Sequence, residues 1–322
     1  MGRYVIRRLL WSVLVVLLVT MITFVIFYVM PPGDPAVRFA GKQPTPELIA
    51  EVKEQLGLDK SLPVQYGLFV KRLVLGDEYG WPGLGFSYDS REPVKNELME
   101  RLPRTLLLAG GAAVIWVILG VTIGIISALK RGTWADRLAM GFALFGISAP
   151  VFWLGLMALF IFWEKLGIEG VGTGYTEFSE SPSGWFGHMI MPWIVLALLY
   201  SAFYARMTRG NLIDTMGEDY IRTARAKGLP ENQVVMKHGL RASLTPVVTM
   251  FGMDVALLIG GAVITETVFN IQGLGAWAVQ SVFGSDLPAV VGVTVVLAIA
   301  VTAMNLLVDI VYAYLDPRVR YS

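Results

Sequence analysis

Residues 9–30 read LLWSVLVVLLVTMITFVIFYVM, without one charged side chain. An α-helix crosses the hydrocarbon core of a bilayer with about 20 apolar residues, so this stretch is long enough to span it. The whole chain is 55% hydrophobic and 16% charged, whereas about a quarter of the residues of a soluble domain are charged. Five further segments share this apolar character. Together the six predict an all-α integral membrane protein with about six transmembrane helices, at 9–30, 105–129, 138–163, 189–204, 244–268 and 289–314.

The basic residues of the connecting segments predict how these helices are oriented. If the N-terminus is cytoplasmic, the inside connections contain many Lys and Arg residues, and the short outside loops contain only Lys165. Basic residues favour the cytoplasmic side of a membrane, so we expect both termini to be cytoplasmic. A cleaved signal peptide would have an apolar core of about 7–15 residues. The longer 9–30 segment is therefore expected to stay as an anchor.

The expected domain organisation follows from this orientation. Residues 1–30 form the cytoplasmic N-terminus and the first transmembrane helix, and residues 31–104 form an extracytoplasmic domain inserted after it. Residues 105–316 form a core with helices two to six and a cytoplasmic loop at about 206–241, and residues 317–322 form a cytoplasmic tail.

Local signals predict structure within these parts. In the outside segment, Thr45 followed by a proline and a glutamate is typical of a helix start, and Gly57 of its end. A second amphipathic stretch follows at 64–75. Inside the membrane, Gly120 and Gly124 have the spacing that lets two helices approach closely. Pro150 is expected to bend the third span.

The sequence contains little that predicts an enzyme or a metal site. It has no cysteine, and its two histidines, His188 and His238, fall on opposite sides of the predicted membrane. No Gly-x-x-x-x-Gly-Lys-Ser/Thr phosphate loop occurs, so the chain is not expected to bind ATP. No Ser/His or paired-Asp arrangement inside the bilayer predicts an intramembrane enzyme. We therefore expect a non-catalytic chain with no metal site and no cofactor of its own.

The cytoplasmic stretch GEDYIRTARAKGLP, residues 217–230, predicts a short helix, a sharp corner and a second helix. Acidic residues open the first helix, basic residues close it, and Gly228 ends it, so its macrodipole is complemented. Pro230 can begin the second helix. A basic loop that only sets the topology would not need this order, so we favour a docking surface for a partner. Its expected residues are Asp219, Tyr220, Arg222, Thr223, Ala224, Arg225, Ala226, Lys227, Gly228 and Leu229.

This stretch resembles the EAA coupling motif of bacterial ABC importer permeases. Arg222-Thr223-Ala224 stands where generic members have Glu-Ala-Ala, a departure that is typical of the dipeptide/oligopeptide branch. The long segment after the first span is similar to the B-type permease of that branch rather than to its C-type partner. Similarities to the branch run along the whole chain, at 3–10, 32–36, 101–106, 260–269, 305–309 and 315–321, and residues 270–273 depart from it by lacking a proline.

The resemblance implies the type I ABC importer permease fold and a pore-forming subunit for di- or oligopeptide uptake. It implies a homologous C-type permease, two ATPase subunits that would hold ATP and Mg, and an extracytoplasmic peptide-binding protein, in a bacterial or archaeal plasma (inner) membrane. Nucleic acid is not an expected partner. The same machinery for nickel chelates, sugars or another small solute is one alternative. A proton- or sodium-coupled secondary transporter is another, but it would show inverted repeats or several buried ionisable groups.

One charged residue lies near the middle of a predicted span. Asp254 falls in the fifth span, and a carboxylate at that depth is costly, so it should face a wet cavity or a polar partner. Either a pore-lining role, in which it attracts the amino terminus of a peptide, or a hydrogen bond to a neighbouring helix would meet this requirement. The residues expected to share its helical face, as a candidate substrate pathway, are Met250, Leu257, Leu258 and Gly261.

Overall fold

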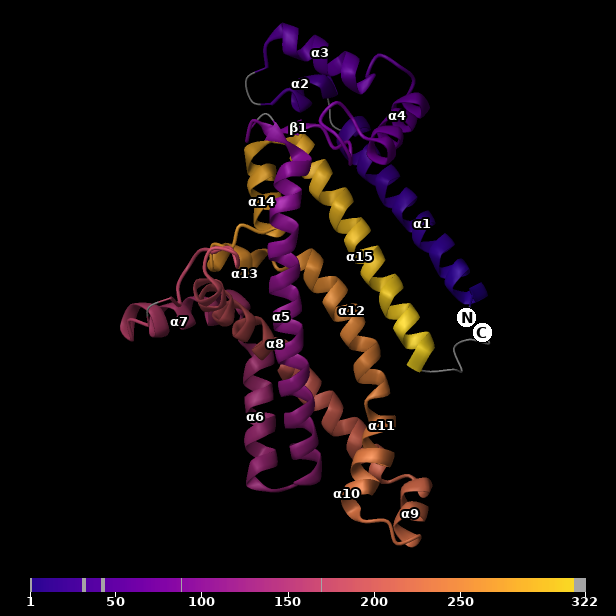
Figure 1. Ribbon diagram of the computed structural model, residues 1–322, viewed down its shortest axis with the longest axis vertical. Helices are drawn as coiled ribbons and strands as arrows, with labels where there is room; N and C mark the ends of the chain where they lie inside the picture. Colours follow the sequence, from indigo (N-terminus) through magenta and orange to yellow (C-terminus); the bar gives the residue numbers. More distant parts are fainter. Residues whose placement is uncertain (1, 31–32, 42–43, 88, 169, 316–322) are drawn as a thin grey trace. The chain divides into compact units, whose positions relative to one another are not determined.

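The computed structural model describes residues 2–30, 33–41, 44–87, 89–168 and 170–315 (Figure 1). At residues 2–4, 259–261 and 311–315 it describes the backbone alone. The predicted tail at 317–322 and the prolines at 31–32 lie outside the described residues.

The described chain is almost entirely helical. In chain order the elements are α1 (Gly2–Phe24), the π-helical η1 (Val25–Val29), α2 (Pro35–Phe39), α3 (Pro46–Leu56), α4 (Leu62–Leu75), β1 (Phe86–Ser87), β2 (Glu92–Pro93), α5 (Val94–Leu129), α6 (Trp134–Ser148), α7 (Val151–Ala158), the π-helical η2 (Leu159–Lys165), α8 (Pro182–Met216), α9 (Asp219–Ala226), α10 (Glu231–Gln233), the π-helical η3 (Val234–Gly239), α11 (Leu240–Ser243), α12 (Thr245–Gly261), α13 (Val263–Val268), α14 (Leu274–Gly284) and α15 (Leu287–Leu315). The two short strands pair antiparallel, with Phe86 opposite Pro93.

Among the described residues, four helices are long and apolar enough to cross a membrane, judged by length and composition. They are Val5–Val29, Val94–Leu129, Pro182–Met216 and Leu287–Ile310. Two bent helix pairs raise the count to six if each pair forms one span: Trp134–Ser148 with Val151–Lys165, and Glu231–Ser243 with Thr245–Leu258. This agrees with the predicted all-α membrane protein of about six spans.

Several helices differ in extent from the predicted spans. The second span, predicted at 105–129, lies in α5, which begins at Val94. The third span is broken by a bend of 104° after Ser148, where Pro150 lacks an N–H group and its ring excludes a continuous helix. The fourth helix, predicted at 189–204, runs from Pro182 to Met216. Its last turns are polar, which ends the apolar signal but not the helix. Leu212 is nevertheless fully buried there.

The chain divides into two compact units, of which the first comprises residues 1–106, 259–263 and 272–322. Within it, α1 and α15 lie side by side (Figure 1), and the Nη1 atom of Arg8 is 3.1 Å from the Oδ2 atom of Asp309. The predicted helix at Thr45 is α3, since the Thr45 hydroxyl caps the Leu48 amide. Gly57 ends this helix at a φ of 65°.

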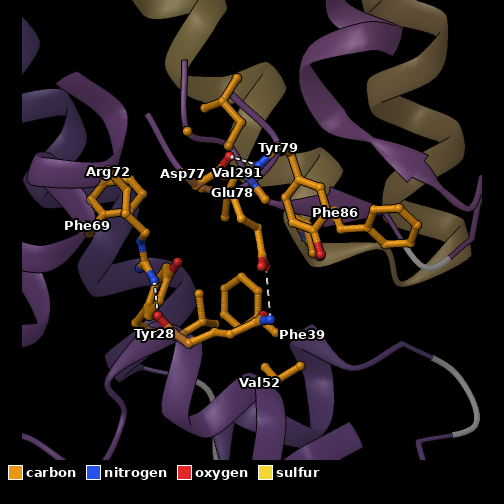
Figure 2. Close-up of a pocket in the computed structure, with 16 residues that line it drawn as sticks. Tyr28, Phe39, Val52, Phe69, Arg72, Asp77, Glu78, Tyr79, Phe86 and Val291 are labelled. Atoms are coloured by element: carbon orange, nitrogen blue, oxygen red, sulfur yellow. Dashed lines mark hydrogen bonds between the residues drawn. The ribbon is translucent and has the colours of Figure 1, made fainter. Parts of the chain in front are cut away.

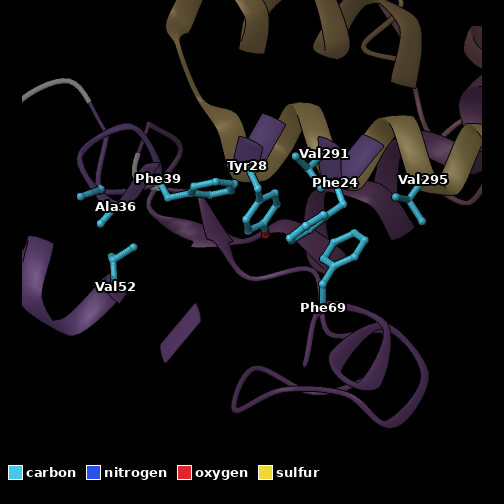
Figure 3. Packing of buried hydrophobic residues seen from close by; sticks show 9 residues of the cluster. Phe24, Tyr28, Ala36, Phe39, Val52, Phe69, Val291 and Val295 are labelled. Atoms are coloured by element: carbon cyan, nitrogen blue, oxygen red, sulfur yellow. The ribbon is translucent and has the colours of Figure 1, made fainter. Parts of the chain in front are cut away.

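An aromatic cluster forms the core of this unit (Figure 3). The ring of Tyr28 lies 4.8 Å from that of Phe24, 4.6 Å from that of Phe39 and 5.7 Å from that of Phe69, centroid to centroid. Val291 of α15 packs against the same cluster. Such aromatic pairs add about 0.5–1.5 kcal/mol each beyond the apolar area they bury. The cluster therefore joins the segment after the first span to the ends of α1 and α15.

The second unit comprises residues 107–258 and 264–271. Its helices α5 and α8 approach closely where the glycine spacing predicted it. A Cβ atom on Gly120 would lie 2.5 Å from the Cβ of Tyr204, and one on Gly124 would lie 2.6 Å from the Cβ of Thr208. Both distances are too short for a side chain, so glycine is required at each position.

Candidate functional site

The stretch at 217–230 folds as a short amphipathic helix followed by a corner. In α9, Ile221 is fully buried and Ala224 is 7% exposed, and both pack with Val234 of the following helical segment. Met216 and Leu229 cover this small core. Burial of this side of α9 leaves the other side free for a partner.

Gly228 forms the corner between the two helical segments. Its φ is +76°, a left-handed conformation that glycine adopts without strain and β-branched residues avoid. Its amide donates to the Arg225 carbonyl at 2.9 Å, and the Leu229 amide donates to the Ala224 carbonyl at 3.4 Å. These two hydrogen bonds satisfy the carbonyls at the end of α9. A Cβ at Gly228 would meet no atom within 4 Å, so the requirement for glycine comes from φ alone.

The exposed side of α9 is held in place by local ion pairs. Arg225 donates to Glu231 through Nε at 3.0 Å and through Nη2 at 2.7 Å, across the Gly228 corner. Arg222 donates to Asp219 at 3.3 Å. Of the residues predicted for this surface, Asp219, Tyr220, Arg222, Thr223, Arg225, Ala226, Lys227 and Gly228 are exposed, whereas Ala224 is buried and Leu229 is half-buried.

We call α9, the Gly228 corner and the helical segment at Glu231–Ser243 the α9 knob. The second segment of this knob packs against α8. A Cβ on Gly239 would lie 2.9 Å from the sulfur of Met216 and 3.3 Å from Leu212 Cδ1. The Nδ2 of Asn211 donates to the Ser243 carbonyl at 3.3 Å. Ile221, Gly239 and Glu231 were not among the residues predicted for this surface. The recurrence of Ile221 and Ala224 three residues apart was a signal for the buried side.

A largely buried ion pair ties α8 to the first turn of α6. Arg209 donates to Asp136 through Nε at 2.7 Å and through Nη2 at 2.9 Å, and the Gly132 amide donates to Asp136 at 2.9 Å. The Ser127 hydroxyl is a further donor. The Asp136 side chain is 7% exposed and that of Arg209 is 26% exposed. This pair was not predicted, although Asp136 is the one acidic residue among Lys130, Arg131 and Arg137 in the sequence.

Asp254 lies beside an aromatic cluster formed by α5, α8 and α12. The buried Tyr204 donates its hydroxyl proton to Oδ2 of Asp254 at 2.7 Å. The Trp116 ring stacks on Tyr200 at 4.5 Å and meets Phe251 edge-on at 5.8 Å, centroid to centroid. Within the described part of the chain, Oδ1 of Asp254 accepts no hydrogen bond. One carboxylate oxygen is thus fixed by a neighbouring helix and the other is free to bind a cation.

The residues predicted to share the face of Asp254 differ in exposure. Met250 and Asp254 are half-buried, Leu257 is 71% exposed and Leu258 is 4% exposed. Leu258 therefore packs inside the chain. The exposure of Gly261 lies outside the described residues. Among the described residues, no group of three or more His, Cys, Asp or Glu is arranged to hold a metal ion.

Sequence comparison finds full-length relatives. The family model described as binding-protein-dependent transport system inner membrane component matches residues 120–321, and the model of its N-terminal part matches residues 1–109. A putative peptide transport system permease protein of Brucella abortus is 39% identical over 100% of both chains. A dipeptide transport system permease protein of Alkalihalophilus pseudofirmus is 37% identical over 99% of both, and a glutathione transport system permease protein of Escherichia coli is 40% identical over 100% of both.

Two solved structures share the fold. An inward-facing structure of the MetNI methionine ABC transporter aligns with a TM-score of 0.56 and 20% identity, covering 70% of this chain and 99% of that one. A crystal structure of an amino acid ABC transporter with histidines aligns with a TM-score of 0.53 and 14% identity, covering 68% and 94%. At these identities the likeness establishes the shared helical fold.

Proposed function

The chain belongs to the family of binding-protein-dependent transport system inner membrane components, and we propose that it is a pore-forming permease subunit of an ABC importer for di- and oligopeptides. It is a multi-pass membrane protein. The observation that carries the proposal is the α9 knob, a short helix with one buried side, an exposed basic side and a glycine corner. The names of the full-length relatives support a peptide cargo.

The proposal includes the remaining subunits of the importer. A homologous C-type permease would complete the pore, two ATPase subunits would bind ATP and Mg, and an extracytoplasmic binding protein would deliver the peptide. The chain itself would be non-catalytic and would lie in a bacterial or archaeal plasma membrane with both termini inside. ATP-driven movement would reach the membrane through α9 as a rigid-body shift.

Reconstitution tests this function. The chain is co-purified with its C-type permease, ATPase and binding-protein partners, and uptake of the dipeptide Ala-Phe into vesicles is measured with and without ATP. We expect uptake that needs both ATP and the binding protein. Uptake of a nickel chelate or a sugar in place of peptide would contradict the peptide assignment. Uptake driven by a proton or sodium gradient without ATP would contradict the whole proposal.

Single cysteines in this cysteine-free chain test the orientation. Glu51 of α3 and Asn232 of α10 are both exposed. We expect a membrane-impermeant maleimide to label Glu51→Cys from outside intact cells, and Asn232→Cys only after the membrane is opened. Labelling of Asn232→Cys from outside would reverse the proposed topology.

We propose that Asp254 lines the substrate pathway with Met250 and Leu257 and attracts the amino terminus of the cargo. The free Oδ1 oxygen and the half-buried position of the carboxylate support this role. Leu258 and Gly261 were expected on the same pathway. The burial of Leu258 favours a packing role for that residue, whereas Gly261 stays a candidate.

Asp254→Asn removes the charge while keeping the shape and an acceptor for Tyr204. A hydrogen bond to a charged group contributes about 1.5–3 kcal/mol, so we expect uptake of Ala-Phe to fall about tenfold. Uptake of N-acetyl-Ala-Phe should change little. Tyr204→Phe serves as the matched control, because it removes the hydrogen bond to Asp254 and keeps the charge. Equal losses with both peptides for Asp254→Asn would leave Asp254 with a structural role only.

A further inference from the structure

The first unit contains a pocket of about 280 Å³ beside its aromatic core (Figure 2). Its apolar wall is formed by Tyr28, Phe39, Val52, Phe69, Phe86 and Val291. Small-molecule sites usually measure about 300–1,000 Å³ and combine an apolar lining with a few convergent polar groups. This pocket lies just below that range, which suits a ligand of one or two amino-acid residues.

Two opposite charges line the same pocket. Arg72 donates through Nη1 to the Gln55 carbonyl at 2.7 Å, and the Gln55 side chain donates to Oε1 of Glu78 at 3.0 Å. Gln55 therefore connects the guanidinium to the carboxylate through neutral groups. In the described part of the chain, neither Arg72 nor Glu78 is in an ion pair. Arg72 keeps unused N–H donors and Glu78 keeps an unused oxygen.

The third charge in the lining is already satisfied. Asp77 accepts from the Tyr79 amide at 2.9 Å and from the Gly85 amide at 2.8 Å. These bonds fix the turn that carries Glu78. With two carboxylates and one guanidinium, the lining disfavours an anionic lipid headgroup. A ligand with one positive end, one negative end and an apolar body matches it better.

We propose that this pocket binds a short peptide directly, at a site distinct from Asp254. The apolar side chain of the ligand contacts the aromatic wall, its α-carboxylate binds Arg72, and its α-amino group binds Glu78. The choice of a peptide rests on the proposed function. The pairing of each charge with a ligand end rests on the pocket itself.

The test uses the complex of this chain with its permease and ATPase partners in nanodiscs of neutral lipid, without the binding protein or ATP. Binding is measured by calorimetry with three probes: Ala-Phe, N-acetyl-Ala-Phe and Ala-Phe-amide. Glu78→Gln should lower the affinity for Ala-Phe about tenfold and leave the affinity for N-acetyl-Ala-Phe unchanged. Arg72→Gln should weaken Ala-Phe by a similar factor and leave Ala-Phe-amide unchanged.

Matched controls are Glu54→Gln and Lys71→Gln, which change the same charges at exposed positions outside the pocket lining. Both should bind all three probes as the unaltered chain does. Arg72 also donates a hydrogen bond to the Gln55 carbonyl, so Arg72→Gln can disturb the fold. If that variant fails to assemble, Glu78→Gln alone still tests the proposal. Unchanged Ala-Phe binding in Glu78→Gln would contradict the proposal that this pocket binds a peptide. An equal loss of affinity for all three probes would contradict it as well.

The pocket and the proposed function can fail separately. In one outcome, the reconstituted importer takes up peptide while the complex alone does not bind Ala-Phe. That result would contradict the peptide site in the pocket and would agree with the proposed function. Probe-selective binding without any ATP-dependent peptide uptake would support the pocket and contradict the function.

Discussion

A Gly228→Val variant is expected to assemble with its partner subunits and to lose peptide uptake by roughly tenfold or more. Gly228 has a φ of +76°, where a β-branched residue is an outlier and strain of about 1–3 kcal/mol is typical. A side chain at this position would meet no other atom, so the strain comes from the backbone. It can be relieved only by a change of the backbone dihedral angles at residue 228. That movement would break the Gly228–Arg225 backbone hydrogen bond and displace α9 from the segment that begins at Pro230.

The measurement pairs ATP-dependent uptake with the ATPase rate of the reconstituted complex. We expect uptake to fall and substrate stimulation of the ATPase to disappear. Gly228→Asn is the conservative variant, because Asn tolerates the left-handed conformation better than Val. Gly167→Val is the matched control, since Gly167 has a φ of +59° and equally open surroundings, outside the knob. Full uptake by Gly228→Val would remove the corner from the coupling mechanism.

The features that the sequence predicted well are those that depend on a few neighbouring residues. Gly57 and Gly228 end helices with positive φ, a conformation that glycine adopts without steric cost. Gly120 and Gly124 pack against another helix as their spacing indicated. In each case the signal lies within one or two helical turns, although the surface that Gly120 and Gly124 contact belongs to α8.

The features that it missed depend on contacts between distant residues. Tyr204 lies 50 residues from Asp254 in the sequence, and Arg209 lies 73 residues from Asp136. No nearby residue in the sequence identifies Tyr204 or Arg209 as a partner. The sequence therefore could not distinguish a pore-lining role for Asp254 from a hydrogen bond to a neighbouring helix. The end of α8 was also missed, because Arg206 and Arg209 stop the apolar run while the helix continues.

The ion pair between Asp136 and Arg209 yields the second large expected effect. Removing one member of a buried pair leaves the other charge without its partner, which costs about 3–5 kcal/mol at full burial. Arg209 is 26% exposed, so we expect Arg209→Met to cost an amount near or below the lower end of that range. A lower thermal-unfolding midpoint of the purified complex should report this. The matched control is Arg206→Met, which removes an exposed arginine from the same helix and should leave the midpoint nearly unchanged.

A double-mutant cycle separates the pair from its surroundings. Asp136→Asn keeps one acceptor oxygen, so it can hold the bond from Ser127 at Oδ1 or the bond from the Gly132 amide at Oδ2, but not both. The cycle separates the cost of losing Arg209 from the cost of that second bond. If the two side chains act together, the double variant Asp136→Asn with Arg209→Met should be destabilised by clearly less than the sum of the single variants. Additive losses would show that the contact contributes nothing as a pair. Arg209 lies two turns before the end of α8, and α9 follows directly. A coupled pair would therefore also join the first turn of α6 to the base of the α9 knob. In that case, both single variants should lower uptake more than they lower the ATPase rate.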